Sequence, residues 1–199
     1  MYKIIQIFLF CIVFTFFANY QVYTQYTQPN KKTEDRIVLP IKLDSKFVPS
    51  GWMGDGKAGK KYLLFKRVPV SINDEKQVGI NIIYSNGPTW AGIYWQYPEN
   101  NWGESPGISL VGAKRIVFYA KGENGDEILE FKSGGITGEY GDTFESSTGK
   151  IILTKDWKEY SINLEKHNLS NVIGGFSWNA SSADNNGKLN FYLANIIIE

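Results

Sequence analysis

Apolar and polar residues alternate along most of the chain after residue 36, with the two-residue period of a half-buried β-strand. The alternation is clearest at 77–85 and 90–97. Similar runs predict further strands at 36–42, 61–70, 114–121, 127–132, 151–154, 157–164, 172–178 and 189–198. Many short strands separated by turns predict an all-β fold, an antiparallel sandwich or barrel.

The segments between these runs are rich in Gly, Pro and Asn. We predict loops at 47–56 and 98–107 and a long excursion at 133–149. The sequence Gly122-Glu123-Asn124-Gly125 predicts a hairpin that joins the strands on either side of it. Parity along the strands predicts that Trp95 and Trp178 point into the core, and Trp157 is expected there because the strand that it starts has other inward-facing apolar residues.

The N-terminus has a different pattern. Lys3 precedes an apolar run at 4–18, which is typical of a secretory signal peptide, although an uncleaved N-terminal anchor is the alternative. Residues 19–35 are polar and predict a linker, so the folded domain should be 36–199. We therefore expect a secreted or extracytoplasmic protein, which meets a membrane only through an uncleaved anchor.

Composition narrows the choice of partner. Cys11 is the only cysteine of the chain, so the predicted domain has no disulfide and no thiolate site. The formal net charge is +1 and no basic stripe is present, which argues against a nucleic-acid partner. Aromatic residues make up 15% of the chain, and segment 90–103 combines five aromatic rings with amides and a carboxylate. That mixture suits a neutral glycan, because flat rings stack on sugars and amides bind their hydroxyls, but it is also found in ordinary cores.

The second half resembles the galactose-binding-like jelly roll of carbohydrate-binding modules. The resemblance rests on strand motifs at 116–122, 127–132, 153–164, 173–178 and 191–196. More narrowly, the segments VPSGWMGDG (48–56), WAGIYWQYPENNWG (90–103), EFKSGGI (130–136) and IGGFSW (173–178) resemble a group of uncharacterised secreted proteins. The resemblance implies a β-sandwich that binds carbohydrate. Such modules often hold a structural calcium through an Asp in the last strand, but Asn195 occupies that place here, so we predict no cofactor, with a structural calcium as the alternative.

Most enzyme classes lack their residues in this chain. The only histidine, His167, lies among polar neighbours, where it is expected to be a solvated loop residue and not part of a triad. A glycosidase would need two carboxyls across one cleft, and Glu127 and Glu130 point to opposite faces of a strand. Glu130 would need a partner such as Glu99, Glu104 or Asp142. We therefore predict a protein without catalytic activity.

The predicted binding site lies on the open face of one sheet and its rim. The candidate ligand-binding residues are Trp52, Tyr94, Gln96, Asn101, Trp102, Glu130 and Lys132. Purely structural alternatives stay open. Trp52 and Trp102 can cover the ends of the sandwich, and Glu130 and Lys132 can form a solvated ion pair. The predicted function is glycan or polysaccharide binding by an exported module. The alternatives are an adaptor domain for a protein partner and, less favoured, a glycan-cleaving enzyme that uses a carboxylate pair.

Overall fold

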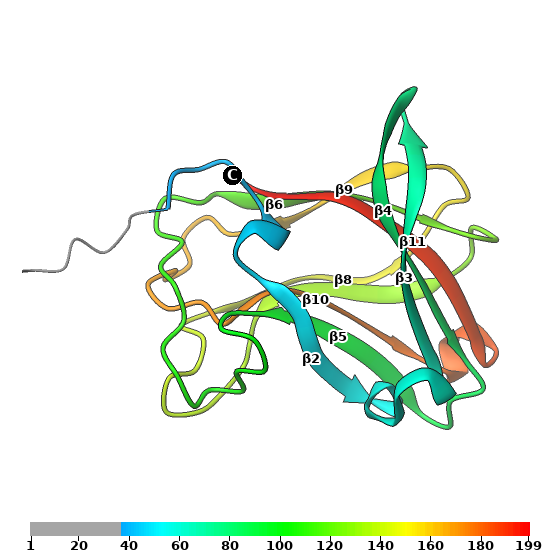
Figure 1. Ribbon diagram of the computed structural model, residues 1–199, viewed down its shortest axis with the longest axis horizontal. Helices are drawn as coiled ribbons and strands as arrows, with labels where there is room; N and C mark the ends of the chain where they lie inside the picture. The colour runs from blue at the N-terminus through cyan, green and yellow to red at the C-terminus, as the bar shows by residue number, and fades with distance from the viewer. Residues whose placement is uncertain (1–36) are drawn as a thin grey trace, which may run out of the picture. The chain divides into compact units, whose positions relative to one another are not determined.

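The computed structural model describes residues 37–199 of the chain. The predicted signal peptide or anchor and the whole of the predicted linker lie outside these residues, so they stay predictions. The described part forms two antiparallel sheets, as the strand pattern predicted (Figure 1). The strands are β1 (Ile41–Lys42), β2 (Val48–Gly54), β3 (Leu63–Ile72), β4 (Glu75–Ser85), β5 (Trp90–Gln96), β6 (Arg115–Gly122), β7 (Ile128–Gly134), β8 (Glu145–Ile152), β9 (Lys158–Asn163), β10 (Gly174–Ser181) and β11 (Lys188–Ile198). Three short 3-10 helices complete the fold: η2 (Leu43–Ser45), η3 (Asp55–Lys61) and η4 (Ala183–Asn185).

The strands divide between two sheets, which we call sheet A and sheet B. Sheet A has the order β3-β4-β11-β6-β9, with β1 also paired to β11, and sheet B has the order β2-β5-β10-β7-β8. Successive strands often change sheet, which buries one face of each sheet against the other. The core is aromatic: Phe118 and Phe191 of sheet A contact Phe131, Phe176 and Trp178 of sheet B. This core holds the sandwich without any cysteine in the described part.

Three local predictions were wrong. Segment 47–56 is not a loop, because 48–54 pairs with β5 as the edge strand β2 of sheet B. Gly122–Gly125 does not close a hairpin, because β6 belongs to sheet A and β7 to sheet B. The buried carboxylate of Glu127 accepts hydrogen bonds from the backbone N–H groups of Asn124, Gly125 and Asp126, which shapes this corner between the sheets. Finally, β8 begins at Glu145, inside the predicted excursion.

One of the two outer strands of sheet A is β3, and the other is β9. Strand β3 pairs with β4 from Leu63 to Ile72, and the turn end of this hairpin projects beyond the rest of the sheet (Figure 1). Its other edge is unpaired in the described part of the chain and carries Lys66, Arg67 and Pro69.

The three predicted core tryptophans have different environments. Trp95 and Trp178 are buried, as predicted. Trp157 is only half-buried and lies on the outer surface, where Lys121 Nζ is 5.7 Å from its ring and the ring of Tyr192 is 6.4 Å away. The prediction for Trp157 was wrong because Trp157 lies three and five residues before the inward-facing Tyr160 and Ile162, and an odd separation places it on the opposite face of the strand.

The difference between these rings is testable. We expect Trp178→Ala to lower the free energy of unfolding by about 3–5 kcal/mol, because it leaves a large cavity in the core. Trp157→Ala should cost no more than about 1.5 kcal/mol, since it removes a partly solvated ring and a cation–π contact. Urea denaturation of both variants measures the two costs, and equal losses would contradict this assignment.

Candidate functional site

The outer face of sheet B brings together side chains from five strands. One row across the sheet is Met53, Gly92, Asn179, Glu130 and Lys150, and the next row is Gly51, Tyr94, Ser177, Lys132 and Ser147. Leu129 and Phe131 point inward, which confirms that Glu130 and Lys132 face outward. We call this surface the outer-face site.

Charged groups of the outer-face site form a connected set. Lys132 Nζ lies 2.7 Å from a carboxylate oxygen of Glu145 and 3.8 Å from one of Glu130. The hydrogen bond to Glu145 is the main reason why the pKa of Lys132 is raised. Asn179 Nδ2 donates to Glu130 over 3.3 Å, and its amide oxygen accepts no hydrogen bond within residues 37–199. The ion-pair alternative for Glu130 and Lys132 is therefore present, but polar atoms beside it are still available to a ligand.

A small hollow of about 110 Å³ lies next to this set. Its polar lining comes from Glu130, Asn179, Ser181 and the ion pair Lys150–Asp184, whose charged atoms are 2.7 Å apart. Trp90 lines the same hollow and is 42% exposed. Sequence reasoning missed Trp90, Asn179 and Ser181 as candidates. The parity that placed Trp90 opposite to Ile93 and Trp95 was the signal that could have found it.

Tyr94 is not the exposed ring that we predicted. Its side chain is 8% exposed, and its hydroxyl donates to the carbonyl of Gly134 over 2.9 Å. The ring lies across Gly174, where an added Cβ would come within 2.9 Å of it. Burial raises the pKa of the Tyr94 hydroxyl. The ring therefore lies beneath the surface of the outer-face site, where neighbouring segments cover it.

Gln96 and Asn101 are also buried, against the prediction that they face solvent. Gln96 is 0% exposed; it accepts from the Ser50 hydroxyl over 2.8 Å and donates to the Asn101 carbonyl over 2.8 Å. The Asn101 side chain donates to the carbonyls of Tyr97 and Ser105 and accepts three backbone N–H groups from Gly103, Glu104 and Ser105. These amides hold the 98–107 loop against the sheet. The period of a strand could not reveal this, because the loop that covers Gln96 lies outside the strand.

Trp102 is the exposed aromatic residue of that loop, with 38% of its surface accessible. Its ring meets Tyr94 edge to face, with 6.1 Å between the ring centroids. Its backbone N–H donates to the carboxylate of Glu104 over 2.7 Å, which fixes the loop below the ring. Trp102 therefore stands at the border of the outer-face site, as predicted for a rim residue.

Trp52 belongs to a different place. It is in strand β2 and points between the two sheets, where it meets Phe65 edge to face at 6.2 Å. It is half-buried and packs against the core, which agrees with the alternative that this ring covers the sandwich. A hollow of about 560 Å³ opens beside Trp52 and Trp102, and we call it the edge pocket.

The 3-10 helix η3 borders the edge pocket and is held by Asp55. This carboxylate accepts hydrogen bonds from the Tyr84 hydroxyl and from the backbone N–H and hydroxyl of Thr89. Burial acts to raise the pKa of Asp55, but these hydrogen bonds outweigh it and the pKa is lowered.

Three of the carboxyl groups considered for catalysis form hydrogen bonds or ion pairs with other parts of the protein. Asp142 is largely buried and accepts backbone N–H groups of Ile136, Ile173 and Gly174, so it serves to hold the loop before β8. Burial raises the pKa of Asp142. Glu104 supports Trp102, and Glu130 is paired with Lys132. His167 is exposed, as expected of a solvated residue.

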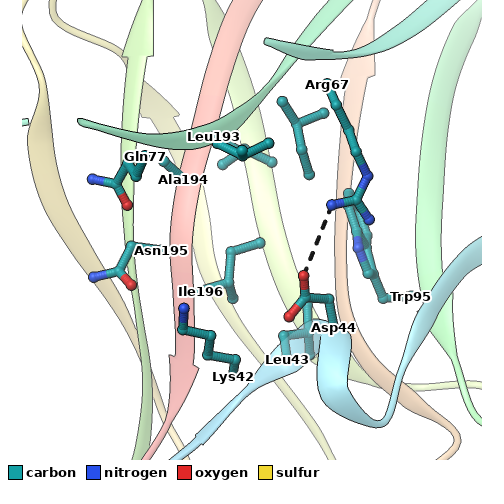
Figure 2. A pocket seen from close by; sticks show the side chains of 12 residues that line it. Lys42, Leu43, Asp44, Arg67, Gln77, Trp95, Leu193, Ala194, Asn195 and Ile196 are labelled. Atoms are coloured by element: carbon teal, nitrogen blue, oxygen red, sulfur yellow. Dashed lines mark ion pairs between the residues drawn. The ribbon is translucent and has the colours of Figure 1, made fainter. Parts of the chain in front are cut away.

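A third hollow, of about 340 Å³, lies between the β3–β4 hairpin, η2 and β11 (Figure 2). Asp44 pairs with Arg67 over 3.9 Å, and Lys42 and Asn195 lie on the opposite side of the hollow (Figure 2). Calcium prefers six to eight oxygen ligands, several of them carboxylates. One carboxylate beside two cations does not fit that ion, and residues 37–199 contain no group of three His, Cys, Asp or Glu side chains placed to hold a metal.

No protein-family model matches the chain, and no curated protein matches it in sequence. Solved structures are similar in fold. A family 30 carbohydrate-binding module is 16% identical, with 81% of this chain and 99% of that chain covered and a TM-score of 0.53. The family 11 module of the cellulosomal cellulase Lic26A-Cel5E of Clostridium thermocellum is 16% identical, with coverages of 82% and 95% and a TM-score of 0.50. The family 30 module of the cellulosomal cellulase Cel9D-Cel44B of the same organism is 19% identical, with coverages of 81% and 98% and a TM-score of 0.50.

These similarities establish the fold. Residues 37–199 have the jelly-roll, galactose-binding-like fold that the sequence motifs indicated. Within the same residues, no helix has the length and apolar character to cross a membrane.

The buried amides give a first prediction for this region. Gln96→Ala should lower the free energy of unfolding by about 1–3 kcal/mol, because Ser50 and the Asn101 carbonyl lose a buried partner. A matched substitution of the exposed amide Asn124→Ala, whose side chain makes no hydrogen bond within residues 37–199, should cost less than about 0.5 kcal/mol. Chemical denaturation of both variants measures the difference, and an unchanged Gln96→Ala protein would show that the network contributes nothing.

Asp55 gives a prediction on pH. Because the folded pKa is lowered, the carboxylate stabilises the fold above its ordinary pKa of 3.8, and this contribution disappears as the pH falls through the folded pKa. Asp55→Asn should therefore melt at a lower temperature than the parent at pH 7, and the gap should close below about pH 3.8. Thermal melts from pH 7 to pH 2.5 test this. A gap that stays constant over the whole range would rule out the charge as its cause.

Proposed function

We propose that this protein binds glycan chains on the outer-face site of sheet B without cleaving them. The observation that carries the proposal is a pair of exposed indoles that flank the outward-facing side chains of β5. Trp90 lies at one end of this row along the strand, and Trp102, from the 98–107 loop, lies at the other. Trp90 and Tyr94 are four residues apart on the strand, about 13 Å, and Trp102 lies against Tyr94. The spacing leaves room for a short run of sugar units.

The surface between the indoles suits a polyhydroxyl ligand. Gly92, in the middle of the row, is covered by the Met53 side chain, whose Cε would lie 2.8 Å from an added Cβ, and Asn179, Glu130 and Ser181 supply donors and acceptors beside it. Apolar rings at the ends and polar groups in the centre match the alternating C–H faces and hydroxyl edges of a glycan. The fold similarity to carbohydrate-binding modules supports the same ligand class, although a fold alone does not determine a function.

A non-catalytic role agrees with the chemistry of the site. Glu130 is held by Lys132 and Asn179 in a set of contacts that suits hydrogen bonding to hydroxyls. The carboxyl of Asp142 has its oxygens occupied by backbone N–H groups. We also propose that the protein is exported, because the signal or anchor predicted at 1–18 would carry the domain to glycans outside the cell.

The aromatic pair provides the test. We expect Trp90→Ala and Trp102→Ala each to weaken binding about 3- to 10-fold, the equivalent of one aromatic contact, with little change in melting temperature because both rings are exposed. Affinity electrophoresis in gels with mixed-linkage β-glucan, xylan or galactan measures the change. Trp157→Ala is the matched control, since it removes an indole from the surface of sheet A.

The outcomes separate the candidate functions. Retardation that is lost with Trp90 and Trp102 but kept in Trp157→Ala supports the proposal. No retardation of the parent protein by any polysaccharide overturns it in favour of a protein-binding adaptor. Release of reducing ends by the parent protein, abolished in Glu130→Gln, would establish the glycosidase alternative instead.

A further inference from the structure

The edge pocket lies outside the outer-face site, at the open side of the sandwich. Its lining comes from β2 of sheet B, β3 of sheet A, η3 and the 98–107 loop. The helix η3 connects β2 to β3 (Figure 1). The residues that line it are Ser50, Trp52, Gly56, Lys57, Gly59, Lys60, Leu63, Phe65 and Trp102. Its volume of about 560 Å³ falls in the range of sites for small ligands.

The inner walls of the edge pocket are apolar and aromatic. Trp52 and Phe65 pack edge to face against each other, and Leu63 is buried beneath them. Trp102 enters from the opposite side, from the 98–107 loop. Flat apolar walls of this kind suit the C–H face of a ring, because contact with them removes apolar surface from water.

The rim is held in place before any ligand arrives. Asp55 fixes the start of η3 through Tyr84 and Thr89. Gly54 and Gly59 have φ angles of 55° and 62°, which side chains rarely adopt, so the rim can turn tightly at both places. The side of Gly56 is closed by Leu63, whose Cδ2 would lie 3.0 Å from an added Cβ. Binding to this pocket therefore needs little ordering of the chain.

The charge of the rim has one sign. Lys57 and Lys60 are both exposed at the pocket, form no ion pair within residues 37–199, and share the lining with no carboxylate. Asp55 and Glu104 do not line the pocket, because their carboxylates are turned to other partners: Asp55 accepts from Tyr84 and Thr89, and Glu104 accepts from the backbone of Trp102. A ligand that fits the pocket should thus carry an apolar face together with a negative charge.

We propose that the edge pocket binds a uronic acid residue, with its C–H face against the aromatic walls and its carboxylate at Lys57 and Lys60. The inference rests on the proposed function for the class of ligand, a sugar, and adds a second site and a preference for acidic sugars. Trp102 borders both sites, so an acidic side branch of a glycan on the outer-face site can enter the pocket around β2.

Small glycosides of known charge test the pocket directly. The probes are methyl galacturonoside and methyl glucuronoside, with methyl galactoside and methyl glucoside as their neutral counterparts. We expect the acidic pair to shift the NMR signals of the Trp52 and Trp102 indole N–H groups and to leave Trp90 unchanged. The Lys57→Gln/Lys60→Gln double variant should bind the acidic probes about tenfold more weakly, since charge-assisted contacts are lost. It should bind the neutral probes as the parent does, and added salt should weaken only the acidic probes.

A matched control removes the general effect of charge. Lys155→Gln/Lys188→Gln takes away two exposed lysines that do not line the pocket, so the net charge of both double variants is equal. If the control weakens acidic probes as much as Lys57→Gln/Lys60→Gln does, or if neutral probes shift Trp52 equally well, the inference is overturned. These results leave the proposed function standing, because neutral polysaccharide binding through Trp90 is measured separately. Conversely, a parent protein that binds no polysaccharide but gives the expected Trp52 shift supports the pocket while the proposed function fails.

Discussion

The packing of aromatic rings between the two sheets is the constraint on which the rest of the structure depends. Phe118 of sheet A lies 4.6 Å from Phe131 and 5.1 Å from Phe176 of sheet B, and Phe191 lies 5.1 Å from Trp178, measured between ring centroids. Residues 37–199 contain no cysteine, so these ring contacts stabilise the fold where many small exported domains use disulfides. It also decides which side chains face outward. Once alternate residues of β7 and β10 are committed to the core, their neighbours Glu130, Lys132 and Asn179 must lie on the outer face.

The same constraint explains what the sequence could predict. Strands with strict alternation were predicted in their correct places, and the outward direction of Glu130 and Lys132 followed from parity alone. The edge strand β2 escaped notice because it is punctuated by Pro and Gly, which are tolerated where one side of a strand has no partner. The turn at 122–125 was misassigned because turn residues indicate a change of direction without indicating which sheet the chain enters next.

The candidate site was harder to predict than the fold, for a physical reason. Parity tells which face a side chain occupies, but exposure depends on what covers that face. The 98–107 loop folds back over the end of β5, so Gln96 is buried although its face of the sheet is the outer one. Trp52 and Trp102, which the sequence treats alike as aromatic residues near glycines, differ because one sits in a paired strand and the other at the tip of a loop. Trp90, at the other end of β5, stays exposed.

The edge of sheet A that β3 forms affects how copies of the protein can associate. A long, flat edge strand is a template on which a strand from another molecule can add, and repeated addition leads to fibres. Pro69 has no backbone N–H to offer, and Lys66, which forms no ion pair within residues 37–199, places a positive charge on the same strand, so like-charged copies repel each other there. The ten residues of this edge are thereby protected from the strand addition that a high local concentration of the protein would favour.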